Sequence, residues 1–289
     1  MIHLSRRRLA TAAALGLAAP VAAKLSAAIG VTSTAAAQEA TPAPGAVTLE
    51  WLGWSFFRLT SPEGKVILIN PFAENPDSPA APEDITTADL IFAPNGHGDE
   101  IGSTVDIAQR TGARVFAPAE LNTWFIEQGV PEEQIAVRFG NPGDRFSLDG
   151  ITLRMVNATH GSGLPAPSAT TPYGGPASGV FITFENGWTV YFAGSTGATS
   201  DQAMWAEMYK PDLAILPLNG SREPLDFAMQ VKQVATGNPG LATVMPHHQR
   251  VEPPEGATTI AEAQAALDAL GVDVQITEPV VGEVYTFTK

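Results

Sequence analysis

Apolar residues after position 46 occur in short runs that are separated by turns. The segments 47–52, 56–59 and 66–69 are rich in β-branched and aromatic residues, and turn residues at 62–64 interrupt them. Short β-rich runs bounded by turn signals are typical of consecutive strands in a sheet. The beginning of the folded part is therefore predicted to be a meander.

From residue 90 onward, predicted strands alternate with predicted helices. The apolar run 90–93 leads to a helix at 103–110, and Gly112 ends that helix before a strand at 114–117 and a helix at 118–128. We expect further strands at 135–139, 151–157, 180–184, 189–192, 213–216 and 242–245, helices at 202–209, 224–234 and 259–270, and two closing strands. This alternation predicts an α/β layered architecture. The segment between His160 and Gly179 lacks apolar periodicity and is expected to be a lid or a surface loop.

The first 37 residues are predicted to be an export signal. Ser5, Arg6, Arg7 and Arg8 precede an Ala- and Leu-rich stretch at 10–23, and small residues at 35–37 offer a cleavage site. The stretch is short for a membrane span and contains Pro20. Adjacent arginines resemble a twin-arginine signal, which implies a bacterial protein exported to the periplasm or beyond. The alternative is an uncleaved, lipid-associated anchor. We expect a linker at 38–46 and one domain at 47–289.

Composition excludes several classes of protein. Of the 289 residues, 44% are apolar, which is enough for a substantial core, and none is cysteine, so disulfides and thiolate sites are absent. Removing the signal leaves 12 of the 16 basic residues against all 30 acidic ones, a formal net charge of −18. Such a surface repels phosphate backbones and anionic headgroups, so we expect a small-molecule substrate, no nucleic acid and no stable membrane insertion.

One polar hexapeptide follows the predicted strand at 90–93. It reads Asn95-Gly96-His97-Gly98-Asp99-Glu100. Glycine permits tight turns, so the glycines are expected to let the backbone aim Asn95, His97 and Asp99 at one point. Imidazole and carboxylate groups at this spacing are suitable metal ligands. The alternative is a polar turn that ends a strand.

The histidines share one kind of position. Only four lie beyond the predicted signal, and each comes directly after a predicted strand: His97, His160, His247 and His248. In layered α/β folds, strand ends bring polar groups from distant segments together. This placement predicts a common site.

Several motifs occur together in the order of a known family. They are Leu52-Gly53-Trp54-Ser55, Ile69-Asn70-Pro71-Phe72, the hexapeptide at 95–100, Tyr191-Phe192-Ala193-Gly194-Ser195-Thr196-Gly197 and Val244-Met245-Pro246-His247-His248. The chain thus resembles the metallo-β-lactamase superfamily, in the branch of UPF0173-type metal-dependent hydrolases and ascorbate-6-phosphate lactonases. The resemblance covers about 47–250. It implies an αββα four-layer sandwich and hydrolysis of an ester, lactone, amide or phosphodiester with one or two metal ions.

The resemblance assigns ligands only in part. By this resemblance, the ligand positions of the first metal are occupied by Asn95, His97 and His160. The ligand positions of the second metal are occupied by Asp99, Glu100 and His248. A bridging aspartate is replaced by Ser195, and an upstream histidine and aspartate by Trp54 and Asn70. His97, Asp99, His160 and His248 match the pattern, whereas five supporting positions do not.

The charges of the two ligand groups predict a single metal. Asn95, His97 and His160 offer two neutral imidazoles and an amide, whereas Asp99, Glu100 and His248 offer two carboxylates and one imidazole. We expect one divalent ion in the second group, zinc first, with manganese or iron as alternatives, and hydrolysis through metal-activated water.

Other residues are assigned supporting roles around this ion. Asp99, His97 and His160 are the expected catalytic residues, and Thr196 or backbone N–H groups at 194–197 are expected to hold an oxyanion. Trp54 is expected to make the pocket apolar, or else to be a core aromatic residue. Asn70, Ser195 and His247 complete the surroundings of the ligands.

The replaced positions leave a second function open. The competing hypothesis is a non-catalytic descendant of the family that has lost the metal and binds a ligand or partner.

Overall fold

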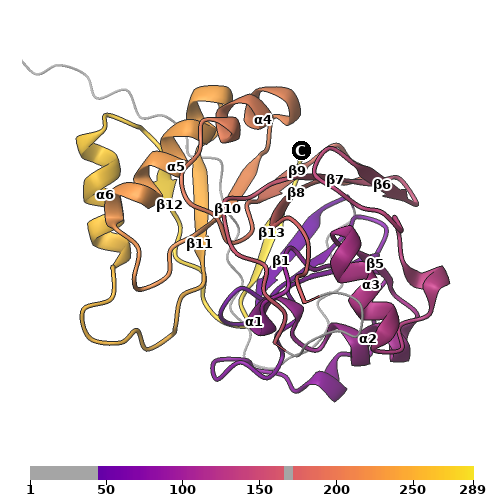
Figure 1. Cartoon of the computed structure of the whole chain (residues 1–289). Coiled ribbons are helices and arrows are strands. Elements are labelled where there is room, and N and C mark those ends of the chain that lie inside the picture. The colour runs from indigo at the N-terminus through magenta and orange to yellow at the C-terminus, as the bar shows by residue number, and fades with distance from the viewer. Residues whose placement is uncertain (1–44, 166–171) are drawn as a thin grey trace, which may run out of the picture.

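Two β-sheets lie face to face at the centre of the molecule, and helices cover the outer face of each (Figure 1). This computed structural model describes residues 45–165 and 172–289. The αββα four-layer sandwich expected from the sequence is confirmed. The expected signal at 1–37 and most of the linker lie outside the described residues, and the first strand begins at Val47 as expected.

The first sheet contains six strands, in the order β13-β1-β2-β3-β4-β5. The expected meander forms its antiparallel half, and β3, β4 and β5 are parallel. The bounds are β1 Val47–Trp51, β2 Phe57–Thr60, β3 Val66–Ile69, β4 Leu90–Phe92, β5 Arg114–Phe116 and β13 Val284–Phe287. Three helices cover it: α1 Gly98–Ile101, α2 Thr104–Thr111 and α3 Ala119–Glu127.

The second sheet contains seven strands, in the order β12-β11-β10-β9-β8-β7-β6. β6 to β9 are antiparallel, and β9 to β12 are parallel. The bounds are β6 Arg145–Leu148, β7 Ile151–Asn157, β8 Ser178–Thr183, β9 Thr189–Phe192, β10 Leu213–Pro217, β11 Thr243–His247 and β12 Gln275–Ile276. Three helices cover it: α4 Asp201–Tyr209, α5 Pro224–Gly237 and α6 Ile260–Ala269.

The central core lies between the inner faces of the two sheets. Alternate residues of each strand point inward, and on β1 these are Val47, Leu49 and Trp51, all buried. Phe57 of one sheet meets Phe192 of the other edge to face, with ring centroids 6.1 Å apart. Burying a side chain of this size contributes about 1.5–3 kcal/mol, so pairs of this kind hold the sheets together.

One sequence prediction of local structure is wrong, and one strand was not predicted. The segment 135–139 is not a strand: Ile135 forms one isolated bridge with Val115, and the chain then turns away, leaving Phe139 73% exposed. The sequence also failed to indicate β6, since this edge strand is half polar and its residues alternate between exposed and half-buried. No helix among residues 45–165 and 172–289 is long and apolar enough to cross a membrane.

Candidate active site

The ends of strands from both sheets bring the predicted polar residues to one edge of the sandwich. Asn70 follows β3, His97 follows β4 and His160 follows β7. Ser195 follows β9, and His248 follows β11. Parallel strands direct their carboxyl ends to the same edge, which explains why residues up to 178 positions apart in the chain meet there.

Glu100 lies at the centre of the first group of contacts. Its carboxylate is buried, with 1% of the side chain exposed. Ser195 Oγ donates to Glu100 Oε1 at 2.5 Å, and Asn70 Nδ2 donates to Glu100 Oε2. A buried carboxylate is costly unless it is hydrogen-bonded and paired with a charge. These two donors, which the sequence placed near the site, satisfy one oxygen each.

His248 supplies the charge that balances this carboxylate. Its Nε2 lies 3.2 Å from Glu100 Oε1 and 3.6 Å from Asp99 Oδ2. Burial alone would lower the pKa of His248, but the two carboxylates outweigh burial and raise the pKa to about 9. The imidazole is therefore protonated at neutral pH and forms an ion pair with both acids.

Trp54 donates to the same Asp99 oxygen that faces His248. The indole Nε1 donates to Asp99 Oδ2 at 2.9 Å, and the backbone of Trp54 has φ 53° in the turn after β1. Burial raises the pKa of Asp99, but the hydrogen bonds from His248 and Trp54 lower it further than burial raises it, to about 2. Asp99 is therefore ionised over the physiological range. Trp54 is only partly buried, so it is not a core aromatic residue.

His247 fixes the ring of His248. The two Nδ1 atoms are 2.7 Å apart, and His247 is fully buried against Phe192, with ring centroids 4.6 Å apart. Burial lowers the pKa of His247 well below its ordinary value. The neutral His247 thus accepts a hydrogen bond from His248 Nδ1–H, which turns His248 Nε2 toward the two acids.

His97 and His160 form a second pair beside this cluster. Their rings meet edge to face with centroids 5.0 Å apart, and His160 is the more exposed of the two. Burial and the nearby charge of His97 lower the pKa of His160, while the Glu100 carboxylate acts in the opposite direction.

Gly96 of the hexapeptide serves close packing, and neither glycine there makes the tight turn expected from the sequence. Neither Gly96 nor Gly98 has a positive φ. A Cβ on Gly96 would come within 2.9 Å of the Ser162 carbonyl, and the Gly96 N–H donates to Ser162 Oγ at 3.0 Å. The segment after His160 thus lies directly on the hexapeptide, while 166–171 lies outside the described residues.

Asn95 is used within its own turn. Its Oδ1, the atom that would bind a cation, accepts the backbone N–H of His97 at 2.9 Å, and its Nδ2 is buried without a hydrogen-bond partner. The Asn95 side chain therefore fixes the start of the hexapeptide, and the structure does not place its oxygen as a free ligand.

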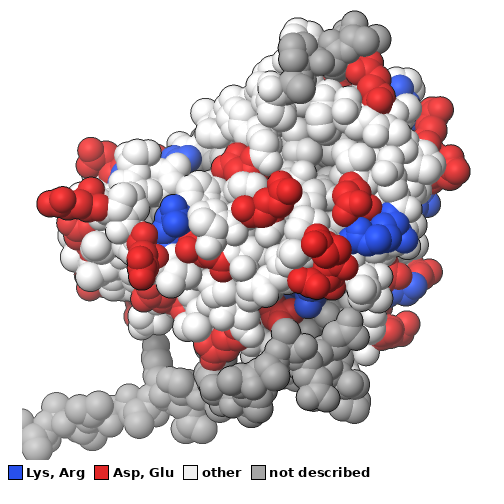
Figure 2. All heavy atoms as spheres, turned by 90° about the horizontal axis from the view of Figure 1, so that it is seen from below, with Lys and Arg blue, Asp and Glu red and all other residues white. Residues whose placement is uncertain are grey.

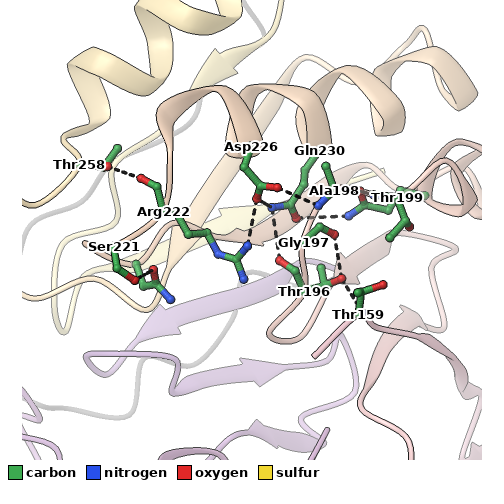
Figure 3. A network of polar contacts seen from close by, with 12 residues as sticks. Thr159, Thr196, Gly197, Ala198, Thr199, Ser221, Arg222, Asp226, Gln230 and Thr258 are labelled. Carbon is green, nitrogen blue, oxygen red and sulfur yellow. Dashed lines mark hydrogen bonds and ion pairs between the residues drawn. The ribbon is translucent and has the colours of Figure 1, made fainter. Parts of the chain in front are cut away.

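The loop after β9 is held by a polar network that the sequence analysis missed (Figure 3). Asp226 accepts hydrogen bonds from Ala198 N at 3.1 Å, from Gln230 Nε2 at 3.0 Å and from Arg222 Nη1 at 3.0 Å. Asp226 and Gln230 are four residues apart and share one face of α5. The sequence signal for this network is the pair Asp226 and Gln230, polar residues four positions apart in a largely apolar helical segment.

Thr196 is committed to the same loop. Its Oγ1 accepts the Thr159 N–H at 2.9 Å and donates to the Gly197 carbonyl at 2.9 Å (Figure 3). The expectation that the Thr196 hydroxyl holds an oxyanion is therefore corrected, since that hydroxyl already joins the segment before His160 to the loop after β9.

A family model described as the Beta-lactamase superfamily domain matches residues 65–275. The chain belongs to the metallo-β-lactamase superfamily. A UPF0173 metal-dependent hydrolase of Methanosarcina mazei is 36% identical over 201 residues, which cover 69% of this chain and 82% of the relative. Another, from Cupriavidus taiwanensis, is 34% identical and covers 79% of this chain and 82% of the relative.

A solved structure supports the same superfamily assignment. The metallo hydrolase Igni18 of the archaeon Ignicoccus hospitalis has a TM-score of 0.67 and 27% identity, covering 84% of this chain and 99% of that protein.

The two expected metal-ligand groups differ in how well they fit an ion. In residues 45–165 and 172–289, no three His, Asp or Glu side chains form a ready metal-binding group. The carboxylates of Asp99 and Glu100 accept hydrogen bonds from Trp54, Asn70 and Ser195. Asn95, His97 and His160 are the weaker set for an ion, because they offer no carboxylate and the amide oxygen already accepts the His97 N–H. Asp99, Glu100 and His248 fit a single divalent ion by donor chemistry, because two carboxylates surround one imidazole nitrogen. Such an ion would replace the His248 proton.

Proposed function

We propose that this chain is a hydrolase that uses one divalent metal ion held by Asp99, Glu100 and His248. The observation that supports this most strongly is the convergence of both carboxylates on His248 Nε2, at 3.2 Å and 3.6 Å. The names of the relatives, metal-dependent hydrolases, point to the same reaction class. We favour zinc, with manganese or iron as alternatives.

The protein residues have separate roles in this proposal. When bound, the ion would supply Lewis acidity, which would lower the pKa of a water molecule at the site toward neutrality. Trp54 orients Asp99, Ser195 and Asn70 orient Glu100, and His247 orients His248. His160, with its lowered pKa, is neutral at pH 7 and can accept a proton. His97 lies against it and completes the proton-transfer pair.

Metal content after dialysis tests the proposal. The wild-type chain is expected to retain about one equivalent of zinc, manganese or iron, because a site with three protein ligands holds its ion tightly. His248→Ala should lose the ion. His160→Ala, the matched control outside the proposed ligand set, should keep the ion and lose hydrolysis of p-nitrophenyl esters. Metal loss from both variants alike would contradict the assignment of ligands.

A second candidate function is a binding protein without catalysis. It is favoured by the charge balance of the site, in which protonated His248 pairs with both acids without any ion. If this is correct, the purified chain will contain no metal, its melting temperature will not change with chelator, and no ester, lactone or amide will be hydrolysed.

We also propose that the chain is exported by a twin-arginine route to the periplasm or beyond. The support is the sequence Ser5-Arg6-Arg7-Arg8 followed by an apolar stretch. The double variant Arg6→Lys/Arg7→Lys should accumulate unprocessed inside the cell, whereas Lys24→Arg should be exported. Equal export of both variants would overturn the proposal.

Small molecules are the proposed partners, and nucleic acid is not. Asp and Glu side chains are spread over the face seen in Figure 2, with fewer Lys and Arg among them. Such a surface disfavours contact with phosphate backbones.

A further inference from the structure

The loop after β10 brings a cationic side chain, Arg222, to the edge at which the candidate site forms. β9, β10 and β11 are adjacent and parallel, so their carboxyl ends lie side by side. β9 leads to Ser195 and β11 leads to His248, whereas β10 leads to Arg222. Arg222 therefore follows the strand that lies between those of two site residues.

The charge of Arg222 acts on the histidines of the site. Burial is the largest cause of the lowered pKa of His160 and of His247, and the positive charge of Arg222 lowers both pKa values further. His160 follows β7 and His247 ends β11, and these strands lie on opposite sides of β10 in the sheet. The cationic group of the β10 loop therefore acts on both sides of the candidate site.

The position of Arg222 is fixed at both its backbone and its side chain. Its backbone N–H donates to the Asn219 carbonyl at 3.0 Å, and its carbonyl accepts from Thr258 Oγ1. Its Nη1 donates at 3.0 Å to Asp226 Oδ2, four residues further on in α5 (Figure 3). A side chain that is held before a ligand arrives loses less conformational entropy on binding.

Part of the Arg222 guanidinium has no partner. Within residues 45–165 and 172–289, Nη1 is the only guanidinium nitrogen of Arg222 with a hydrogen-bond acceptor, and the Nε atom is buried without one. Figure 3 shows the other terminal nitrogen pointing away from Asp226. A buried donor without an acceptor costs free energy, and an incoming acceptor would recover it.

Arg110 provides a comparison within the same chain. It also forms an ion pair with an aspartate four residues away, from Nη1 to Asp106 Oδ2 at 2.8 Å. Its Nη2 donates to the carbonyls of Pro82 and Ile85, at 2.6 Å and 2.9 Å. Both terminal nitrogens of Arg110 are thus used by the chain. Pairing with an aspartate at this spacing does not by itself leave donors over, as it does at Arg222.

The unused donors of Arg222 can be approached from the side of Gly197. The Arg222 side chain is 16% exposed. Gly197 is half-buried, and a Cβ there would lie 4.0 Å from Arg222 Nη1, so the absence of a side chain leaves this approach open. In a guanidinium, Nε and Nη2 direct parallel N–H groups along one edge, which matches the two oxygens of a carboxylate.

The charges around Arg222 favour a carboxylate over a phosphate. Asp226 balances part of the cation, and the exposed Glu223 precedes α5 next to it. A carboxylate brings one negative charge to these acids, whereas a phosphate monoester brings nearly two. The additional repulsion falls on the phosphate alone.

We propose that Arg222 binds a carboxylate group of the substrate through its Nε–Nη2 edge. This inference rests on the proposed hydrolase function and deepens it, because it names a group that the substrate carries in addition to the bond that is cleaved. Arg222 holds the substrate from the β10 loop, and cleavage takes place at the cluster of Asp99, Glu100 and His248.

Three probes with the same ring test the site without any need for activity. Benzoate carries a carboxylate, benzamide is neutral, and phenylphosphonate carries more negative charge at pH 8. In isothermal titration of the full chain, Arg222→Gln should weaken benzoate binding about tenfold, because a hydrogen bond to a charged group is worth at least this factor. It should weaken benzamide and phenylphosphonate less. An unchanged affinity for benzoate, or a larger effect on phenylphosphonate, would overturn the proposal.

Two further variants separate the guanidinium edge from charge and fold. Arg222→Lys keeps the charge and can pair with Asp226 but lacks the two-donor edge, so it should also weaken benzoate binding about tenfold. Arg110→Gln removes an ion pair of the same spacing elsewhere and should leave the affinity within about twofold. Asp226 keeps its bonds from Ala198 and Gln230 in both Arg222 variants. Wild-type affinity of Arg222→Lys would overturn the role of the edge.

A carboxylate bound by the metal ion instead would give a different pattern. Benzoate binding would then be lost in His248→Ala and kept in Arg222→Gln. This result would overturn the inference and leave the proposed function in place.

Hydrolysis completes the distinction between the two proposals. p-Nitrophenyl hydrogen succinate carries a carboxylate and p-nitrophenyl butyrate does not, and both have the same leaving group. Arg222→Gln should lower the ratio of kcat/KM for the succinate ester over the butyrate ester about tenfold, and Arg110→Gln should leave it within about twofold. Hydrolysis with an unchanged ratio would overturn the carboxylate site and leave the hydrolase. Benzoate binding that depends on Arg222, without hydrolysis of either ester, would contradict the proposed function and leave the carboxylate site.

Discussion

Ser195 Oγ donates a hydrogen bond to Glu100 Oε1 across 2.5 Å, although the two residues are 95 positions apart in the chain. The resemblance noted in the sequence implies that both residues, and Asn70, replace residues of the superfamily pattern, and Asn70 donates to the other Glu100 oxygen. The three side chains form one hydrogen-bonded group around a buried carboxylate. The neighbours of Glu100 can therefore be tested one by one.

Removing the Ser195 hydroxyl should destabilise the fold. Ser195→Ala leaves a buried carboxylate oxygen with one donor fewer, which costs about 1–3 kcal/mol. Urea unfolding at pH 7 measures the loss. Ser221→Ala is the matched control, because Ser221 is exposed and bonds only to Asn219 within its own loop. Equal stability of the two variants would show that Glu100 does not depend on Ser195.

Restoring two ligands should create a second metal site. Asn95→His with Ser195→Asp adds an imidazole and places a second carboxylate against Glu100. Without metal, the two like charges should lower the melting temperature, and zinc should raise it again with one more equivalent bound than in the wild type. Asn95→His alone lacks the added acid and serves as the control. No gain of metal in the double variant would contradict the shared position of these residues.

Two tryptophans should lose different amounts of stability on replacement by phenylalanine. Trp54 Nε1 donates to the ionised Asp99, whereas Trp124 Nε1 is buried without a hydrogen-bond partner. Trp54→Phe should cost about 1.5–3 kcal/mol, the range for a hydrogen bond to a charged group. Trp124→Phe removes an unsatisfied donor and loses only packing, so its cost should be smaller. The free energies of unfolding of the two variants measure this difference. A larger loss for Trp124→Phe than for Trp54→Phe would contradict a stabilising hydrogen bond from Trp54 to Asp99.

The cap of α6 should depend on pH. Hydrogen bonds from the Thr259 backbone and side chain lower the pKa of Glu262 below its ordinary value of 4.5. A lowered carboxyl pKa contributes stability above the ordinary pKa, and this contribution is lost as the pH falls through the folded-state pKa. Glu262→Gln should therefore lower the melting temperature at pH 7, and the difference from wild type should shrink below pH ~4.5.

Glu255→Gln is the control for that measurement. Glu255 is exposed, precedes the helix and takes no part in the cap. Its replacement should change the melting temperature little at either pH. A Glu262→Gln difference that stays constant from pH 7 to pH 3.5 would contradict a role for the ionised carboxylate.

The sequence by itself determined the layers and the edge at which the site forms. Short β-rich runs bounded by turns, such as 47–52, identified consecutive strands of one sheet, and β1 begins at Val47 as expected. Histidines placed after strands identified the edge, because parallel strands end together. These signals are local and can be read within one element. The two errors in the strand predictions were local too. The segment 135–139 forms only one isolated bridge, between Ile135 and Val115, and β6 is a half-polar edge strand.

Only the tertiary structure decided how the site residues use their hydrogen-bonding groups. The sequence gives no sign that the Thr196 hydroxyl is consumed by Thr159 N, that the Asn95 oxygen is taken by His97 N, or that Trp54 reaches Asp99. Each of these bonds depends on distances between side chains that only the packed sheets define. The charge of His248 is decided in the same way, because its pKa follows from burial and from two carboxylates that approach it only in the folded chain.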